Sequence, residues 1–221
     1  MKFEQTDILI LGDSFCRFRN SDSHWPFIIS QKLSNSSSQT RGHGFSGTSW
    51  WSVRTRFLKE LEISVPKILI CCHTSPDRIP NDDDVGLNWA TLRNNEIFGN
   101  GEFLNKDKQQ KIIIASKLYF QELWSKDFCA WAQLAWFKEL DKLIEFYKIP
   151  YTIHLMCFEH CPEYIFQNGI TIEEKLYSIA GDDYNNGSNP NHFTEELNKK
   201  IGNRLVDLLL NYQVGQQKLA I

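Results

Sequence analysis

Apolar stretches of two kinds alternate along the chain. Short apolar runs within 8–11, 66–72 and 151–158 have the length of a strand and are bounded by polar residues. Runs of this kind are typical of strands that are buried on both faces of a parallel sheet. A weaker strand is expected at about 39–42. The short runs therefore predict a buried sheet.

Longer segments, with apolar residues at helical spacing, lie between these runs. The first carries Pro26 in its first turn, where a missing N–H costs little, and the last carries Glu195 and Glu196 in its first turn, as the helix dipole favours. We expect helices at 25–33, at about 50–61, at 112–147 with a break near 125–127, and from about 194 onwards. Strands that alternate with helices predict an α/β fold, with a mainly parallel sheet of about five strands between two layers of helices.

The segment from 76 to 110 is polar and irregular, with several Gly and Asn residues. A segment of this length inside a compact domain is usually a lid, a binding loop or an insertion. We expect a single domain over residues 1–221, with 76–110 inserted after the third strand. Arg78 and the run Asp82-Asp83-Asp84 are candidates for contact with a substrate, although such a charge run is more often a solvated surface.

Composition and charge exclude several classes of protein. The 221 residues carry a formal net charge of −3, and the chain has no basic stripe and no zinc-finger spacing, so nucleic acid is not an expected partner. The apolar runs are far shorter than the roughly 20 residues of a membrane span, so a membrane is not an expected partner either.

The amino-terminal sequence lacks the features of a signal peptide, which predicts a cytoplasmic protein. Seven tryptophans exceed the needs of one small core, so a homo-oligomer is one expectation.

Six cysteines are expected to be reduced thiols, most of them in the core. They are Cys16, Cys71, Cys72, Cys129, Cys157 and Cys161. Cys157, His160 and Cys161, with His154 nearby, could contribute to a metal site. A zinc site usually needs a second pair of ligands with similar spacing. The sequence offers no such pair, so we expect no metal.

The first strand ends in Gly12-Asp13-Ser14, which is the main candidate for chemistry. A serine at the carboxyl end of a parallel strand lies where open α/β sheets bind their ligands. A hydrolytic serine needs a general base, and His192 precedes the last helix, at the same edge of a parallel sheet. The Gly-x-Ser-x-Gly elbow of the α/β-hydrolases is absent. The competing interpretation is a strand followed by a turn, since Asp and Ser are common turn residues.

The string Gly42-x-Gly44-x-x-Gly47 matches the fingerprint of dinucleotide-binding folds. That fingerprint normally follows a strong first strand, and an acid for the ribose follows the next strand. Here the string follows a Ser-rich loop, and the next strand ends in His73. The context therefore does not favour nucleotide binding.

Three blocks and their order along the chain resemble the SGNH (GDSL-type) hydrolase superfamily. They are Gly12-Asp13-Ser14 near the amino terminus, Ser46-Gly47-Thr48-Ser49 after the second strand, and His192 before the last helix, together with Trp25-Pro26 at the head of the first helix. The resemblance implies a flavodoxin-like α/β/α sandwich. It also implies a serine hydrolase of the esterase, acylhydrolase or deacetylase type, which cleaves small-molecule or carbohydrate esters without a metal or organic cofactor.

The resemblance also implies roles for particular residues. Ser14 would be the nucleophile that forms an acyl-enzyme, and His192 would be its general base. The backbone N–H groups of Ser14 and Gly47 would donate hydrogen bonds to the oxyanion. Removing one such donor typically lowers the rate by about two to three orders of magnitude.

One departure from the family pattern concerns the oxyanion hole. Ser75 stands where an asparagine side chain normally donates a further hydrogen bond. A serine hydroxyl can donate one hydrogen bond but reaches less far than an amide. We therefore expect a weaker hole, or one completed by Asn81 or another group of the 76–110 segment.

A second departure concerns the group that orients the histidine. Asn189 stands three residues before His192, where an acid is normal, and an Asn there can support the wrong imidazole tautomer. Asp183, or its neighbour Asp182, is a substitute candidate, and a backbone carbonyl is a third option. The two departures also support a second class of function, a binding or structural module that keeps the fold without the chemistry.

Overall fold

The computed structural model describes residues 7–17, 24–33, 40–45, 47–80, 85–88, 98–99, 105–182 and 192–219. Its main sheet has five strands in the order β2-β1-β3-β6-β7. The strands are β1 (Ile8–Gly12), β2 (Thr40–Gly44), β3 (Ile68–His73), β6 (Tyr151–Met156) and β7 (Ile170–Ile172). All neighbouring pairs are parallel, which confirms the predicted α/β class. The order is that of flavodoxin-like sheets, whose ligands bind at the switch point beside the first strand.

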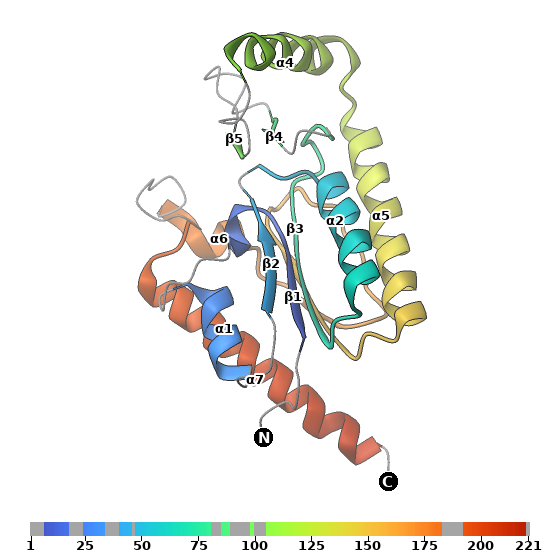
Figure 1. Ribbon diagram of the computed structural model, residues 1–221, viewed down its shortest axis with the longest axis vertical. Coiled ribbons are helices and arrows are strands. Elements are labelled where there is room, and N and C mark those ends of the chain that lie inside the picture. Colours follow the sequence, from blue (N-terminus) through green and yellow to red (C-terminus); the bar gives the residue numbers. More distant parts are fainter. Residues whose placement is uncertain are drawn as a thin grey trace.

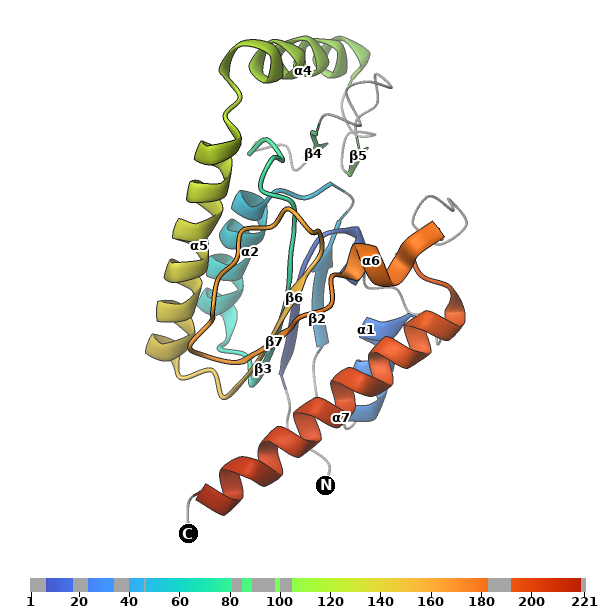
Figure 2. The same ribbon diagram turned by 180° about the vertical axis from the view of Figure 1, so that it is seen from behind.

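Helices cover both faces of this sheet (Figures 1 and 2). On one face, α1 (Trp25–Leu33) packs against α7 (Glu195–Leu219), and on the other α2 (Trp50–Ile63) lies beside α5 (Lys126–Tyr147). Every residue of β1 and β3 is buried, because both faces of these strands are covered. In the part of the chain that the structure describes, no helix is long and apolar enough to cross a membrane.

The segment expected as one broken helix over 112–147 begins earlier than predicted. Asn105 caps α4 (Lys106–Leu118) by accepting a hydrogen bond from the backbone N–H of Lys108 at 2.8 Å. A π-helical turn, Tyr119–Leu123, follows α4. The break lies at 124–125, and the Ser125 hydroxyl caps α5. Cap residues decided both boundaries, whereas the prediction followed the apolar period alone.

The apolar stripe of this segment is only partly core. Its buried members include Trp136, Phe137, Leu140 and Ile144, and its exposed members include Leu118, Leu123, Phe128 and Trp131. Figures 1 and 2 show why, because α4 and the start of α5 extend beyond the carboxyl ends of the five strands of the main sheet. The homo-oligomer stays a prediction.

Two elements of the main body were not predicted, the strand β7 and the short helix α6 (Leu176–Ala180). In β7 only Ile172 is buried, so its apolar signal in the sequence is weak. In the 76–110 segment, β4 (Val85–Gly86) and β5 (Phe98–Gly99) form a short antiparallel pair. Much of the predicted insertion lies outside the described residues.

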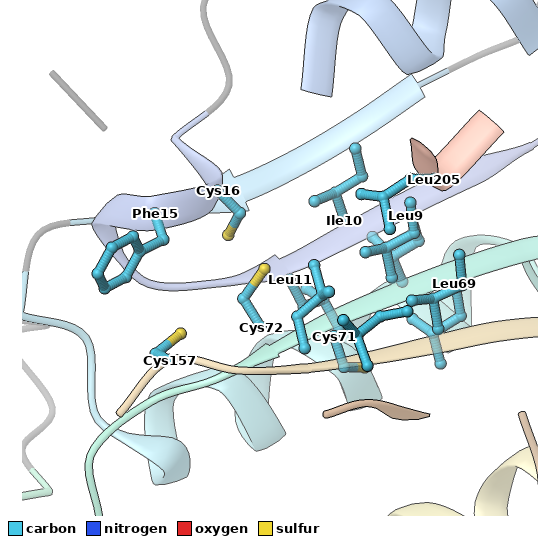
Figure 3. Close-up of a cluster of buried hydrophobic side chains, with 14 of the residues drawn as sticks. Leu9, Ile10, Leu11, Phe15, Cys16, Leu69, Cys71, Cys72, Cys157 and Leu205 are labelled. Carbon is cyan, nitrogen blue, oxygen red and sulfur yellow. The ribbon is translucent and has the colours of Figure 1, made fainter. Parts of the chain in front are cut away.

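All six cysteines are buried and free. Figure 3 shows the side chains of Cys16 and Cys72 facing each other beside Cys157, among the apolar side chains of β1 and β3. Burial raises the pKa of the Cys72 and Cys157 thiols well above its usual value. These cysteines therefore stay protonated and act as small core residues.

A pair of buried histidines joins β3 to β6. His73 Nε2 lies 3.0 Å from His154 Nδ1, and His154 Nε2 lies 3.0 Å from the carbonyl oxygen of Asn168. Because a carbonyl oxygen only accepts, His154 Nε2 carries the proton and His154 Nδ1 accepts from His73. Burial lowers the pKa of His73 well below its usual value and lowers that of His154 to about 4. Both rings are therefore neutral at pH 7.

We predict that this pair makes the free energy of unfolding fall as the pH falls from 6.5 towards 4. The unfolded chain binds protons in this range that the folded chain excludes, so stability is fully present above pH 6.5 and is lost as the pH falls through the folded pKa. For His154 the loss is about 3 kcal/mol. Urea denaturation at a series of pH values measures it. The double variant His73→Phe/His154→Phe should have a flatter profile, and an unchanged slope would contradict the assignment.

Candidate active site

The nucleophile candidate Ser14 lies in a tight turn after β1. Asp13 caps the 3₁₀ turn Ser14–Cys16 by accepting a hydrogen bond from the backbone N–H of Phe15 at 3.0 Å. This turn stands at the carboxyl edge, between β2 and β3, where β1 pairs with both neighbours. Ser14 therefore occupies the switch point at which flavodoxin-like sheets bind ligands.

The structure brings His192 to Ser14. His192 Nε2 lies 2.8 Å from Ser14 Oγ, although 178 positions separate the two residues. The imidazole packs against the Phe15 ring, with 5.1 Å between centroids. When the neutral imidazole carries its proton on Nδ1, the Ser14 hydroxyl donates to Nε2, which is the arrangement that a general base requires. Of the positions considered for orienting this imidazole, Asp183 and Asn189 lie outside the described residues, and Asp182 is exposed.

A buried asparagine on α7 fixes the segment that carries His192. Asn198 is 2% exposed. Its Oδ1 accepts from the backbone N–H of Trp25 at 3.0 Å, and its Nδ2 donates to the carbonyl oxygens of Phe193 and Thr194. The Trp25 indole in turn donates to the carbonyl oxygen of Phe15 at 2.8 Å. The serine turn, the start of α1 and the histidine segment are thus hydrogen-bonded together.

Sequence reasoning missed Asn198, and it did not predict that Trp25 would hold the serine turn by a hydrogen bond. The only signal for Asn198 is a polar residue beside the apolar stripe of the last helix, which is common on any amphipathic helix. Its partners lie on an element far away in the sequence, so the pattern of α7 alone contains no hint of them.

Asp13 is the centre of the polar network behind Ser14. Its carboxylate is fully buried. Besides the Phe15 N–H, it accepts from Arg78 Nη1 at 3.0 Å, from Thr74 Oγ1 at 3.3 Å and from the Cys157 thiol at 3.6 Å. These donors follow β3 and β6, so the carboxylate joins the ends of three neighbouring strands. Asp13, first noted as part of the Gly-Asp-Ser string, holds the nucleophile turn to the rest of the edge.

The glycine block lies in the turn between β2 and α2. Gly47 has φ of 73°, and a Cβ on it would lie 2.5 Å from the Cα of Gly86. A Cβ on Gly44 would lie 2.4 Å from the carbonyl oxygen of Cys16. Two glycines of the supposed dinucleotide fingerprint are therefore explained by close backbone contacts, Gly44 with the Ser14 turn and Gly47 with β4. Ser46, the first residue of the block, lies outside the described residues.

Ser75 follows β3 at the same edge but belongs to a separate cluster. Its hydroxyl is hydrogen-bonded to Asp77 and lies 2.6 Å from His160 Nε2. Burial alone would raise the pKa of Asp77, but hydrogen bonds from His160 and Ser75 and the charge of Arg78 lower it overall. The Ser75 hydroxyl therefore donates its hydrogen bond to the ionised carboxylate, and the Ser75 oxygen accepts from His160. The proton of Ser75 is already used within this cluster.

The residues considered for a metal site have other partners. Cys157 bonds to Asp13, His160 to Ser75, and the Cys161 thiol to the carbonyl oxygen of Thr74 at 3.4 Å. Among the described residues, no group of three or more His, Cys, Asp or Glu side chains is arranged to hold a metal ion.

No protein-family model matches the chain, and no curated protein matches it in sequence. Its function has to be inferred from the site itself.

We predict that Gly47→Ala strongly lowers activity and stability, because the new methyl group meets the Gly86 backbone and the positive φ is strained. Gly181→Ala is the matched control, since Gly181 also has a positive φ, of 51°, but has open space around its Cβ position. Thermal melts of both variants separate the two costs. Gly181→Ala gives the loss of stability from backbone strain alone, and the additional loss in Gly47→Ala gives that from the steric clash. Equal melting temperatures for the two variants would contradict the close contact at Gly47.

Proposed function

We propose that this chain is a serine hydrolase that cleaves ester bonds, as its resemblance to the SGNH (GDSL-type) hydrolases implies. The observation that carries the proposal is the 2.8 Å contact between Ser14 Oγ and His192 Nε2. The position of this pair at the carboxyl edge, beside the switch point of the sheet, supports it further.

The reaction begins when Ser14 Oγ attacks the carbonyl carbon of an ester. His192 Nε2 takes the hydroxyl proton, and the carbonyl oxygen becomes an oxyanion that accepts hydrogen bonds from the backbone N–H groups of Ser14 and Gly47. The protonated His192 then gives its proton to the leaving alcohol, and an acyl group remains on Ser14. Water, deprotonated by the same imidazole, releases the acyl group and restores the serine.

The backbone of His192 favours catalysis over a purely structural role. Its φ of 66° is positive, and the only other non-glycine residue with positive φ in the described part of the chain is Lys148, which ends α5. A left-handed conformation costs a non-glycine residue roughly 1–2 kcal/mol. Strain of this kind is concentrated at functional sites, where a side chain has to be held in one position.

The competing function is a binding or structural module with the same fold. The Asn at position 189 favours it, since the normal acid is missing there. Such a module needs no proton transfer between Ser14 and His192, so the two proposals differ in whether Ser14 reacts. Acetyl or other acyl esters of small molecules or carbohydrates are the proposed substrates.

Labelling and turnover test the reaction of Ser14 directly. We predict that a fluorophosphonate probe labels the chain at Ser14 and that the chain hydrolyses p-nitrophenyl acetate. Ser14→Ala should abolish labelling and lower kcat at least about a thousandfold, because the nucleophile is gone. His192→Gln should do nearly as much.

Ser75→Ala is the matched control, since it removes another buried hydroxyl at the same edge. Because that hydroxyl donates to Asp77, we expect kcat to fall less than about tenfold. Equal background hydrolysis by the wild type and Ser14→Ala, over several acyl lengths, would exclude the enzyme and leave the module.

A further inference from the structure

A buried arginine joins the two segments that carry the proposed oxyanion donors. Arg78 Nη1 donates to Asp13 Oδ2 at 3.0 Å and to the carbonyl oxygen of Thr48 at 3.0 Å. Asp13 immediately precedes Ser14, and Thr48 immediately follows Gly47. The guanidinium therefore lies between the nucleophile turn and the glycine turn.

Among the described residues, the hydrogen-bond partners of this guanidinium all lie on one side of it. Both hydrogen bonds leave from Nη1, whereas the guanidinium has five N–H donors. Arg78 is 5% exposed, and its Nε is a buried donor for which no partner exists among the described residues. The Phe158 ring lies against the guanidinium, 5.3 Å from its central carbon, and limits how the group can turn. Because Nε is enclosed by protein atoms, Nη2 is the nitrogen of Arg78 that is left to donate to a bound molecule.

The serine at position 75 cannot supply a further donor while its proton is bonded to Asp77. Asn81 lies outside the described residues, so the two backbone N–H groups are the remaining candidates for the proposed hole among the groups considered so far that are described. Arg78 is a charged donor, and its hydrogen bonds reach both the segment that contains Ser14 and the segment that contains Gly47. It belongs to the 76–110 segment, in which a completing group was expected.

We propose that Arg78 is the side-chain donor of the oxyanion hole, an inference that rests on the proposed serine hydrolase function. Its Nη2 group donates to the carbonyl oxygen of the substrate, and this bond strengthens as that oxygen gains negative charge.

The charges of the site favour an oxyanion over a permanently anionic substrate group. In the resting site the Arg78 charge is balanced by Asp13. During attack the oxyanion and the protonated His192 appear together, so the site stays balanced. A carboxylate or phosphate on the substrate would instead add a negative charge without a new positive one. Arg78 therefore acts on the transition state and has little effect on binding of a neutral ester.

Arg78→Lys tests this role, because lysine keeps the charge beside Asp13 and loses the fork of donors. We expect kcat for p-nitrophenyl acetate to fall about 100-fold to 1,000-fold, as for the loss of one oxyanion donor, with KM changed less than threefold. Arg54→Lys is the matched control, since Arg54 bonds Glu139 with Nε and Nη2, both at 2.6 Å, on α2 and α5. Its kcat should be unchanged.

Arg78→Gly with added guanidinium provides a second test, in case the lysine variant folds poorly. Saturable recovery of kcat with guanidinium, and no recovery with sodium chloride at equal ionic strength, is expected. If Arg78 only holds Asp13 and Thr48 together, guanidinium restores the melting temperature without restoring kcat, which would overturn the inference. An unchanged kcat in a folded Arg78→Lys protein would also overturn it. If the wild type shows no turnover that depends on Ser14, the proposed function itself is overturned. Failure of the proposed function and failure of the Arg78 inference are therefore distinguishable.

Discussion

Burying the carboxylate of Asp13 is the constraint on which the carboxyl edge of the sheet depends. A fully buried carboxylate is stable only when hydrogen bonds and an opposite charge replace the water that it has lost. Asp13 obtains these from the Phe15 N–H, Thr74, Arg78 and Cys157. Removing one partner of a buried ion pair typically costs about 3–5 kcal/mol. The turn that presents Ser14 is therefore determined by groups that follow β3 and β6 as much as by its own residues.

A second buried polar residue, Asn198, explains why His192 can be held in a strained conformation. Asn198 bonds the carbonyl oxygens of Phe193 and Thr194 and also caps the start of α1. The segment after His192 is thereby fixed to the helix that the Trp25 indole ties to Phe15. Strain at one residue is tolerated when its surroundings leave no relaxed alternative. The hydrogen bonds of Asn198 hold the His192 segment, and those of Asp13 hold the Ser14 turn. Together they keep the His192 imidazole and the Ser14 hydroxyl within hydrogen-bond distance.

The sequence allowed the prediction of features that depend on local pattern. The strands β1 and β3 were recognised because both faces are buried and their residues are uniformly apolar, and α1 was placed at its observed bounds from its apolar period and Pro26. The order of the blocks suggested that Ser14 and His192 share one edge. By contrast, β7 has three residues and a single buried side chain, so it had little pattern to recognise. The bonds of Asp13 to Thr74 and Arg78 span 61 and 65 positions, and no local pattern encodes such pairs.

Two clusters at the same edge show why residue composition does not identify a catalytic site. Ser75, His160 and Asp77 are the residue types of a hydrolytic triad, but the hydroxyl lies between the other two groups. The serine hydroxyl donates to the carboxylate and the imidazole donates to the serine oxygen, so the imidazole cannot act as a base towards Ser75. Asp13 forms none of its described bonds with the Ser14 hydroxyl, which leaves that proton for His192 Nε2. The partners of each hydroxyl therefore separate the proposed nucleophile, Ser14, from the structural Ser75.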